Sequence, residues 1–175
     1  KTLKIGLKKS LKISNDFSTI KNSDMIFVTV GTPQKINGEI ELSMIKKAVK
    51  SIGQVIRKTK KNPIIFIKST VIPGTTKKII LPILEKESGK KAEKDFGVIS
   101  NPEFLQESNA IRDTKCPHAI ILGGNDSKYM KKAKKFFSKM HPNVSIIITK
   151  YQTAEMIKYA NNSFLATKIS FINQL

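Results

Sequence analysis

Three short segments place hydroxyl, amide and carboxylate groups directly after runs of apolar residues. They are residues 31–33 (Gly-Thr-Pro), 69–71 (Ser-Thr-Val) and 101–103 (Asn-Pro-Glu), and a further acid, Glu107, follows four residues after Glu103. Hydroxyls and backbone amides in such positions can hydrogen-bond a nucleotide, and a carboxylate can position a substrate hydroxyl or hold a water molecule. Turn formation alone would explain the Gly, Pro, Asn and Ser residues of any one segment.

Lys158 and Asn162 form a second group of polar side chains near the end of the sequence. Their spacing of four residues places both on one face of a helix. A cation and an amide that point the same way can stabilise a developing oxyanion or hold a water molecule. A solvated surface lysine has the same spacing, so the spacing leaves both interpretations open.

The elements that must position these groups alternate along the chain. Apolar, β-branched runs predict strands, and apolar residues at helical spacing predict helices between them. This order predicts an α/β fold with an open, doubly wound, mostly parallel sheet. The predicted strands are 24–32, 62–75, 95–101, 118–125 and 144–149, and the predicted helices are 42–59, 75–86, 127–140 and a long final helix capped by Thr153.

Ligands of such sheets bind beyond the carboxyl ends of the strands. The three polar segments should therefore meet at one edge, which weakens the explanation by turn formation. A GxGxxG motif between a strand and a helix, with an acid at the distance that a ribose requires, does not occur in the sequence. The residues alone thus predict an incomplete nucleotide-binding sheet.

Composition narrows the possible partners. The 175 residues include 32 Lys+Arg against 13 Asp+Glu, a net charge of +19, but only two of the 32 are Arg and the lysines are scattered. The best explanation of this charge is a general richness in lysine. Binding of an acidic ligand such as a nucleotide is the second explanation, and binding of polymeric nucleic acid is the third. The single cysteine excludes an intrachain disulfide and a multi-cysteine metal site, and no apolar run is as long as a membrane span. We therefore expect a cytoplasmic protein without a membrane or metal partner.

Four motifs occur in order along the chain. They are VGTP at 30–33, KSTVIPGTT at 68–76, SNPEFLQESNAIRD at 100–113 and AEMIKYANNSFLATKISFINQL at 154–175. Together they closely resemble the UDP-glucose/GDP-mannose dehydrogenase family. The resemblance covers essentially the whole chain from residue 11 onward. It implies that residues 1–150 form part of a Rossmann-like NAD-binding domain, namely the second half of its sheet. It also implies that residues 151–175 form the start of a central connecting and dimerisation helix.

The resemblance also implies a reaction. Members of the family oxidise the C6 hydroxyl of a nucleotide sugar twice, with two NAD+, to a uronic acid used in polysaccharide biosynthesis. UDP-glucose is favoured as the substrate over GDP-mannose, and NPEFLxE argues against UDP-N-acetylmannosamine. A non-catalytic nucleotide-binding or scaffold remnant is the alternative of another class.

Site residues follow from the resemblance residue by residue. It implies a cofactor site formed by Val30, Gly31, Thr32, Pro33, Ser69 and Glu107. It implies that Thr70 and Glu103 act on a water molecule, and that Lys158 and Asn162 bind the C6 oxygen and stabilise its charge. Phe104 and Leu105 would contact the sugar beside Glu103, Glu107, Lys158 and Asn162.

Two positions depart from the family pattern, and the single cysteine, Cys116, lies at a position that varies within the family. Cys116 is not the family's nucleophilic cysteine, which we expect beyond this sequence together with the substrate domain. Ala119 stands where many members carry Arg, and Ser108 where Gly is common. Because the Gly-rich loop and the nucleophile are missing from these 175 residues, we expect the polypeptide by itself to be inactive.

Overall fold

Five strands form one sheet in the order β1-β2-β3-β4-β5 in the computed structural model, which describes residues 10–175. The strands are β1 (Met25–Val28), β2 (Ile64–Ile67), β3 (Gly97–Ser100), β4 (Ala119–Gly123) and β5 (Ser145–Thr149). β1, β2 and β3 are parallel, and so are β4 and β5. β4 is antiparallel to β3, with Ser100 opposite Gly123. The predicted α/β fold with a mostly parallel sheet is confirmed, with one antiparallel junction added.

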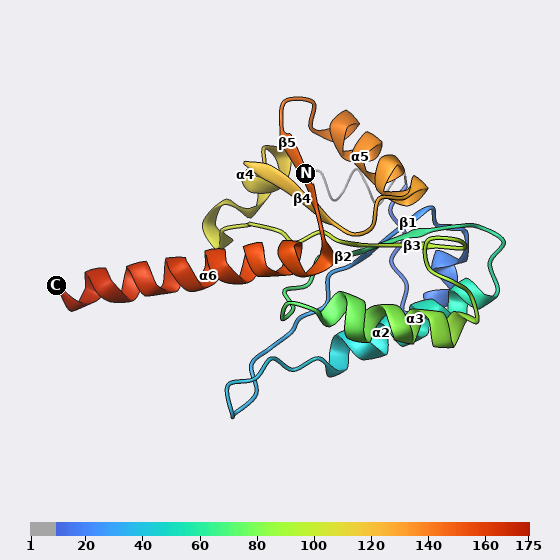
Figure 1. Cartoon of the computed structure of the whole chain (residues 1–175), viewed down its shortest axis with the longest axis horizontal. Coiled ribbons are helices and arrows are strands. Elements are labelled where there is room, and N and C mark those ends of the chain that lie inside the picture. Colours follow the sequence, from blue (N-terminus) through green and yellow to red (C-terminus); the bar gives the residue numbers. More distant parts are fainter. Residues whose placement is uncertain (1–9) are drawn as a thin grey trace.

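Helices cover both faces of this sheet, as Figure 1 shows. α2 (Ser43–Arg57) and α3 (Leu81–Ser88) lie on one face, and α5 (Lys128–Met140) lies on the other. The central strand β2 is buried along its whole length because its side chains enter both layers. Ile65 and Ile67 pack toward α2 and α3, whereas Ile64 and Phe66 pack in the cluster beneath α5. A continuous apolar run is the pattern expected for such a doubly covered strand.

Several elements differ from the expectation. The helix predicted for 75–86 begins as a π-helical turn, η2 (Thr76–Ile80), and continues as α3. The segment between β3 and β4 contains two 3-10 or α-helical turns, η3 (Glu107–Asn109) and α4 (Ala110–Lys115), which the apolar pattern did not indicate. A 3-10 turn, η1 (Phe17–Asn22), precedes β1.

The long final helix α6 (Tyr151–Gln174) corrects one prediction. Thr153 is not its cap, because the helix begins at Tyr151 and Lys150 occupies the cap position without a side-chain hydrogen bond. Tyr151 holds this end instead, since its ring is buried and its hydroxyl donates to the Val98 carbonyl at 3.0 Å. α6 crosses the sheet edge with its first turns and then extends clear of the rest of the molecule (Figure 1). Within residues 10–175, no helix is both long and apolar enough to cross a membrane.

Candidate functional site

The first two predicted polar segments are joined directly by side-chain hydrogen bonds. The Thr32 hydroxyl donates to the Thr70 carbonyl at 2.6 Å, and the Ser69 hydroxyl donates to the Val30 carbonyl at 2.7 Å. These contacts cross between the segments that follow the adjacent parallel strands β1 and β2. The edge predicted from strand polarity therefore forms, with Thr32, Ser69 and Thr70 side by side. Both hydroxyls keep lone pairs that can accept a hydrogen bond from a ligand.

The third segment is attached to the second by Asn101 and Lys68. Asn101 is buried, its backbone N–H donates to the Ile67 carbonyl, and its side-chain amide donates to the Ile121 carbonyl. The Lys68 amine donates to both the backbone and the side-chain oxygen of Asn101, at 3.3 Å each. Asn101 thereby spans the junction between the parallel strands and β4, and it fixes where the following turn begins.

Glu103 and Lys158 form an ion pair at the end of this turn. The Lys158 Nζ atom lies 3.2 Å from a Glu103 carboxylate oxygen, and the side chains are 7% and 31% exposed, respectively. The other Glu103 oxygen accepts the backbone N–H of Leu105, and the Lys158 ammonium lies 5.4 Å from the ring centre of Phe104. Lys158 is therefore not the solvated surface lysine that its spacing left open.

Helix α6 brings Lys158 to this position through its buried face. Tyr151, Ala154, Glu155 and Lys158 are its buried residues, spaced at three and four residues over two turns. Ala154 packs against Gly123 of β4, where even one added methyl group would lie 2.5 Å from the Ala154 Cβ atom. This close approach of helix to strand is what lets the Lys158 side chain reach the end of β3.

Two cations lie near the Glu103 carboxylate. Burial lowers the pKa of Lys68, Glu103 opposes that shift, and Lys158 adds to it through charge repulsion. The site thus holds two lysines that interact with one acid: Lys158 is paired with Glu103, and Lys68 donates to oxygens of Asn101. Such an arrangement gives the strand edge a local positive potential, which suits an anionic ligand or an oxygen that gains negative charge.

The remaining predicted residues occupy less enclosed positions. Asn162 lies one helical turn beyond Lys158 on α6 and is exposed, and Leu105 is 42% exposed. Phe104 is partly buried and contacts Lys158 with its ring. Glu107 begins the 3-10 turn η3, but its side chain is outside what the structure describes. Cys116 is a free, exposed thiol just after α4.

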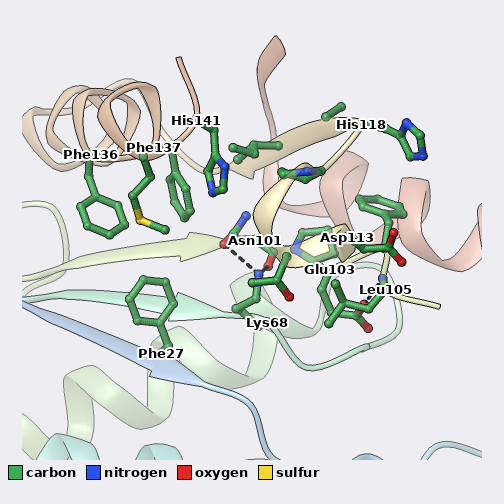
Figure 2. A pocket seen from close by; sticks show the side chains of 17 residues that line it. Phe27, Lys68, Asn101, Glu103, Leu105, Asp113, His118, Phe136, Phe137 and His141 are labelled. Atoms are coloured by element: carbon green, nitrogen blue, oxygen red, sulfur yellow. Dashed lines mark hydrogen bonds between the residues drawn. The ribbon is translucent and has the colours of Figure 1, made fainter. Parts of the chain in front are cut away.

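A cavity of about 320 Å³ adjoins the polar cluster on the α5 side of the sheet. Lys68, Asn101 and Glu103 line one end, and Phe27, Phe136 and Phe137 line the other. Figure 2 shows these aromatic rings turned toward a common space, with the Lys68–Asn101 hydrogen bond beside it. Thr32, Ser69, Thr70 and Lys158 are not among its lining residues. The cavity therefore meets the predicted ligand edge only at the Glu103 turn.

Lys68 and Glu155 are site residues for which the sequence analysis predicted no role, whereas Asn101 belongs to the third predicted polar segment. Glu155 is 2% exposed and accepts the backbone N–H groups of Gly74 and Thr76, at 2.5 and 2.7 Å. Lys68 carried a signal, since it is the charged residue that ends the apolar run Ile64–Ile67. Glu155 carried a weaker one, as an acid three residues before Lys158 on the same helical face.

Comparison with known proteins shows which family the chain is similar to. Residues 2–141 match the NAD binding domain of the UDP-glucose/GDP-mannose dehydrogenase family, and residues 152–175 match the family's central domain. The chain is 42% identical over 166 residues to a GDP-mannose 6-dehydrogenase of Pseudomonas putida, covering 94% of this chain and 37% of that protein. It is 41% identical over 157 residues to a UDP-glucose 6-dehydrogenase of Rickettsia bellii, covering 89% of this chain and 34% of that protein.

Solved structures show the same relationship. A ternary complex of a GDP-mannose dehydrogenase from Pseudomonas aeruginosa superposes with a TM-score of 0.90 at 37% identity, covering 98% of this chain and 39% of that one. A UDP-glucose dehydrogenase from Pyrobaculum islandicum gives 0.86 at 32% identity, with the same coverage of both chains. The chain spans little more than a third of the length of the relatives that it matches. With its NAD-binding fold and matched motifs, this chain belongs to the UDP-glucose/GDP-mannose dehydrogenase family.

Proposed function

We propose that this chain provides the NAD-binding edge and part of the reaction centre of a nucleotide-sugar 6-dehydrogenase. The enzyme would oxidise the C6 alcohol of its substrate to the aldehyde and then to the carboxylic acid, with two NAD+. The observation that carries the proposal is the buried Lys158–Glu103 ion pair at the edge where β1, β2 and β3 end. Lys158 as a whole residue is 6% exposed, and a lysine this buried is uncommon without a functional or structural partner.

The residues after β1 and β2 fit the cofactor. A Cβ atom added to Gly31 would meet nothing within 4 Å, so the backbone there is open to a ligand. Thr32 and Ser69 hold the two loops together beside it. We infer that Val30, Gly31, Thr32, Pro33 and Ser69 bind NAD, and that Glu107 lies where cofactor and substrate meet. NAD+, when bound, supplies the acceptor for the hydride that leaves C6.

Lys158 would act on the substrate oxygen. In each oxidation the C6 oxygen loses a proton while the hydride leaves, so it carries negative charge in the transition state. The Lys158 ammonium would stabilise that charge, with Asn162 as a second donor one turn along α6. The contact with Glu103 supports this role, because one carboxylate oxygen already lies 3.2 Å from Nζ, where a negatively charged substrate oxygen would bind.

Glu103 and Thr70 would act on the water molecule that the second oxidation consumes. The second oxidation needs one oxygen atom from water, and a carboxylate within hydrogen-bond reach can remove the proton of that water. Thr70 follows β2 and Glu103 follows β3, so both approach the site from neighbouring strands. Phe104 and Leu105, next to Glu103, would contact the sugar.

The substrate would be a nucleotide sugar, with UDP-glucose as the first candidate and GDP-mannose or UDP-N-acetylmannosamine as the alternatives. The sequence motifs favour UDP-glucose, and the relatives reported above include both GDP-mannose and UDP-glucose dehydrogenases. The partner of the chain would be a second copy, joined through α6.

A graft tests the proposed function. Residues 10–175 would replace the matching segment of the Pseudomonas putida enzyme and, separately, of the Rickettsia bellii enzyme, and NADH formation would be followed by absorbance. We expect both grafts to reduce two NAD+ per nucleotide sugar, and the second graft to retain the larger share of its host's rate. Grafts that fold and bind NAD+ but form no NADH would support a non-catalytic remnant and contradict the proposal.

A further inference from the structure

Glu155 is a buried carboxylate that the proposed reaction does not use. It lies in the first turns of α6, one turn before Lys158, and both of its oxygens are taken by backbone N–H groups of the loop after β2. One is the N–H of Gly74 and the other is the N–H of Thr76. Glu155 thus connects two elements that are about eighty residues apart in the sequence.

The environment of this carboxylate explains how it tolerates burial. A buried charge is costly unless it is hydrogen-bonded, and hydrogen bonds to a carboxylate are stronger than those between neutral groups. Thr76 begins the helical stretch formed by η2 and α3, so its N–H belongs to a first turn that has no partner inside the helix. A negative charge at this end also interacts favourably with the helix dipole. Gly74 has a φ of 97°, which glycine adopts without strain.

The same loop carries residues of the proposed site. Its beginning is fastened to the segment after β1, because Ser69 donates to the Val30 carbonyl and the Thr70 carbonyl accepts from Thr32. Its end is fastened to α6 by Glu155. From the same face of α6, three residues further on, Lys158 reaches Glu103. One carboxylate therefore links the loop of Thr70 to the helix that presents Lys158.

We propose that Glu155 is a positioning residue that sets the rotation and height of α6 so that Lys158 meets Glu103 opposite the loop of Thr70. This inference rests on the proposed function for the roles of Lys158 and Glu103, but it concerns the geometry of the chain and needs no activity to test. Replacing Glu155 by Gln keeps the shape and one acceptor. It turns an N–H₂ group toward a backbone N–H, so one buried donor loses its partner.

The test compares Glu155→Gln with Tyr151→Phe in the full chain. Tyr151→Phe removes the hydroxyl that contacts the Val98 carbonyl and the Glu93 carboxylate at the same end of α6, without touching Gly74 or Thr76. Native acetylation of lysines, read by mass spectrometry, would report on Lys158, with Lys90, whose amine donates to the Thr59 carbonyl, as the internal reference. We expect Glu155→Gln to raise the acetylation rate of Lys158 about tenfold or more, since the loss of one charged hydrogen bond has an effect of that size. Lys90 should stay unchanged, and Tyr151→Phe should change Lys158 much less.

A spectroscopic signature separates positioning from general loosening. The ¹H–¹⁵N signal of the Lys158 ammonium should be present in the unaltered chain and in Tyr151→Phe, and absent in Glu155→Gln and in Glu103→Gln. A folded Glu155→Gln chain that keeps the Lys158 signal and protection overturns the inference and leaves the proposed function standing. If Lys158 responds as expected but the graft is inactive, the inference about Glu155 stands and the proposed function is contradicted.

A second measurement applies if Glu155→Gln does not fold. Hydrogen exchange of the unaltered chain in increasing urea would be followed at the amides of Gly74 and Thr76 and at the first turns of α6. If Glu155 joins these elements, they should open together with the same free energy. Independent opening of the loop amides would overturn the inference.

Discussion

Lys158 and Glu103 show how a buried charge is accommodated in this protein. Lys158 is enclosed by the helix that carries it and by the Phe104 ring, and its ammonium is compensated by a carboxylate that is itself 31% exposed. Breaking a buried pair by removal of one partner is strongly destabilising, because the other charge stays behind without compensation. The pair therefore makes the reaction centre sensitive to changes at either residue.

The first prediction concerns Glu103. Glu103→Gln should lower the free energy of unfolding by about 2 kcal/mol, less than the roughly 3–5 kcal/mol of a fully buried pair because Glu103 is partly exposed. Urea unfolding followed by circular dichroism measures this. Glu39→Gln is a control, since its ion pair with Lys35 is exposed on both sides. Adding Lys158→Met to Glu103→Gln should recover part of the loss, and a simple sum of the two single losses would contradict the ion pair.

The second prediction concerns Lys68 and pH. Its pKa is lowered from 10.5 chiefly by burial, so the folded chain holds this proton less tightly than the unfolded chain does. The free energy of unfolding should therefore rise as the pH increases from the folded pKa of Lys68 toward 10.5, with the full penalty present at lower pH. Urea titrations across this range should show a smaller rise in Lys68→Met than in the unaltered chain. An exposed replacement, Lys46→Met, should follow the unaltered chain, and identical slopes for all three would refute the prediction.

At the scale of elements, the docking of α6 on β4 depends on one glycine. An Ala at position 123 would place its Cβ atom 2.5 Å from the Ala154 Cβ and 3.0 Å from the Lys150 carbonyl, so helix and strand must separate. Gly123→Ala should cost about 1–3 kcal/mol of unfolding free energy, as overpacking does. Gly31→Ala, which meets no atom within 4 Å, should cost less than about 0.5 kcal/mol. Equal stability of the two variants in thermal unfolding would mean that α6 does not pack on β4 in this way.

Sequence patterns predicted the elements better than their connections. Continuous apolar runs located all five strands, a pattern expected for the doubly covered β2 and β3 but not for the largely exposed β5. Strand polarity correctly placed the segments after β1, β2 and β3 at one edge. The antiparallel junction at Ser100 and Gly123 depends on pairing between distant residues and has no local pattern. The start of α6 at Tyr151 was missed because a tertiary hydrogen bond, not a side-chain cap, holds it.

For the candidate site, too, the sequence identified residues but not their contacts or their burial. Thr32, Ser69, Thr70, Glu103 and Lys158 were identified from the motifs, and the structure brings Glu103 and Lys158 into contact. Spacing alone could not show that Lys158 is buried, because burial depends on how closely α6 approaches β4. The contact of Glu155 with Gly74 and Thr76 was also beyond the sequence, since both partners are backbone groups that any residue would carry.

At the scale of the whole molecule, α6 extends away from the body (Figure 1), and this part of the helix carries exposed apolar side chains. Beyond Lys158 the large exposed hydrophobic residues are Tyr159, Phe164, Leu165, Ile169, Phe171 and Ile172 of α6, and Leu175 directly after it. An uncovered surface of this kind on a helix commonly marks an interface. This is the surface through which we propose that two copies join.

The fourth prediction is therefore self-association. The average mass of the chain should rise above 19.6 kDa with concentration in light scattering, because α6 surfaces pair and bury their apolar side chains. Ile169→Asp should shift this rise to higher concentration, by placing a charge in the paired surface. Met44→Asp alters another exposed apolar residue, on α2, and should leave the rise unchanged. A mass that stays monomeric at high concentration would argue against α6 as an interface.

The most direct test of the account is the turnover of the grafted Pseudomonas putida enzyme with Lys158→Met. If Lys158 stabilises the charge on the C6 oxygen, kcat for NADH formation should fall about 10²–10³-fold, the range for loss of one such donor, with a smaller change in KM. Lys168→Met, on the exposed part of the same helix, should stay within about twofold of the parent graft. A Lys158→Met graft that folds and turns over at the parent rate would contradict the central claim.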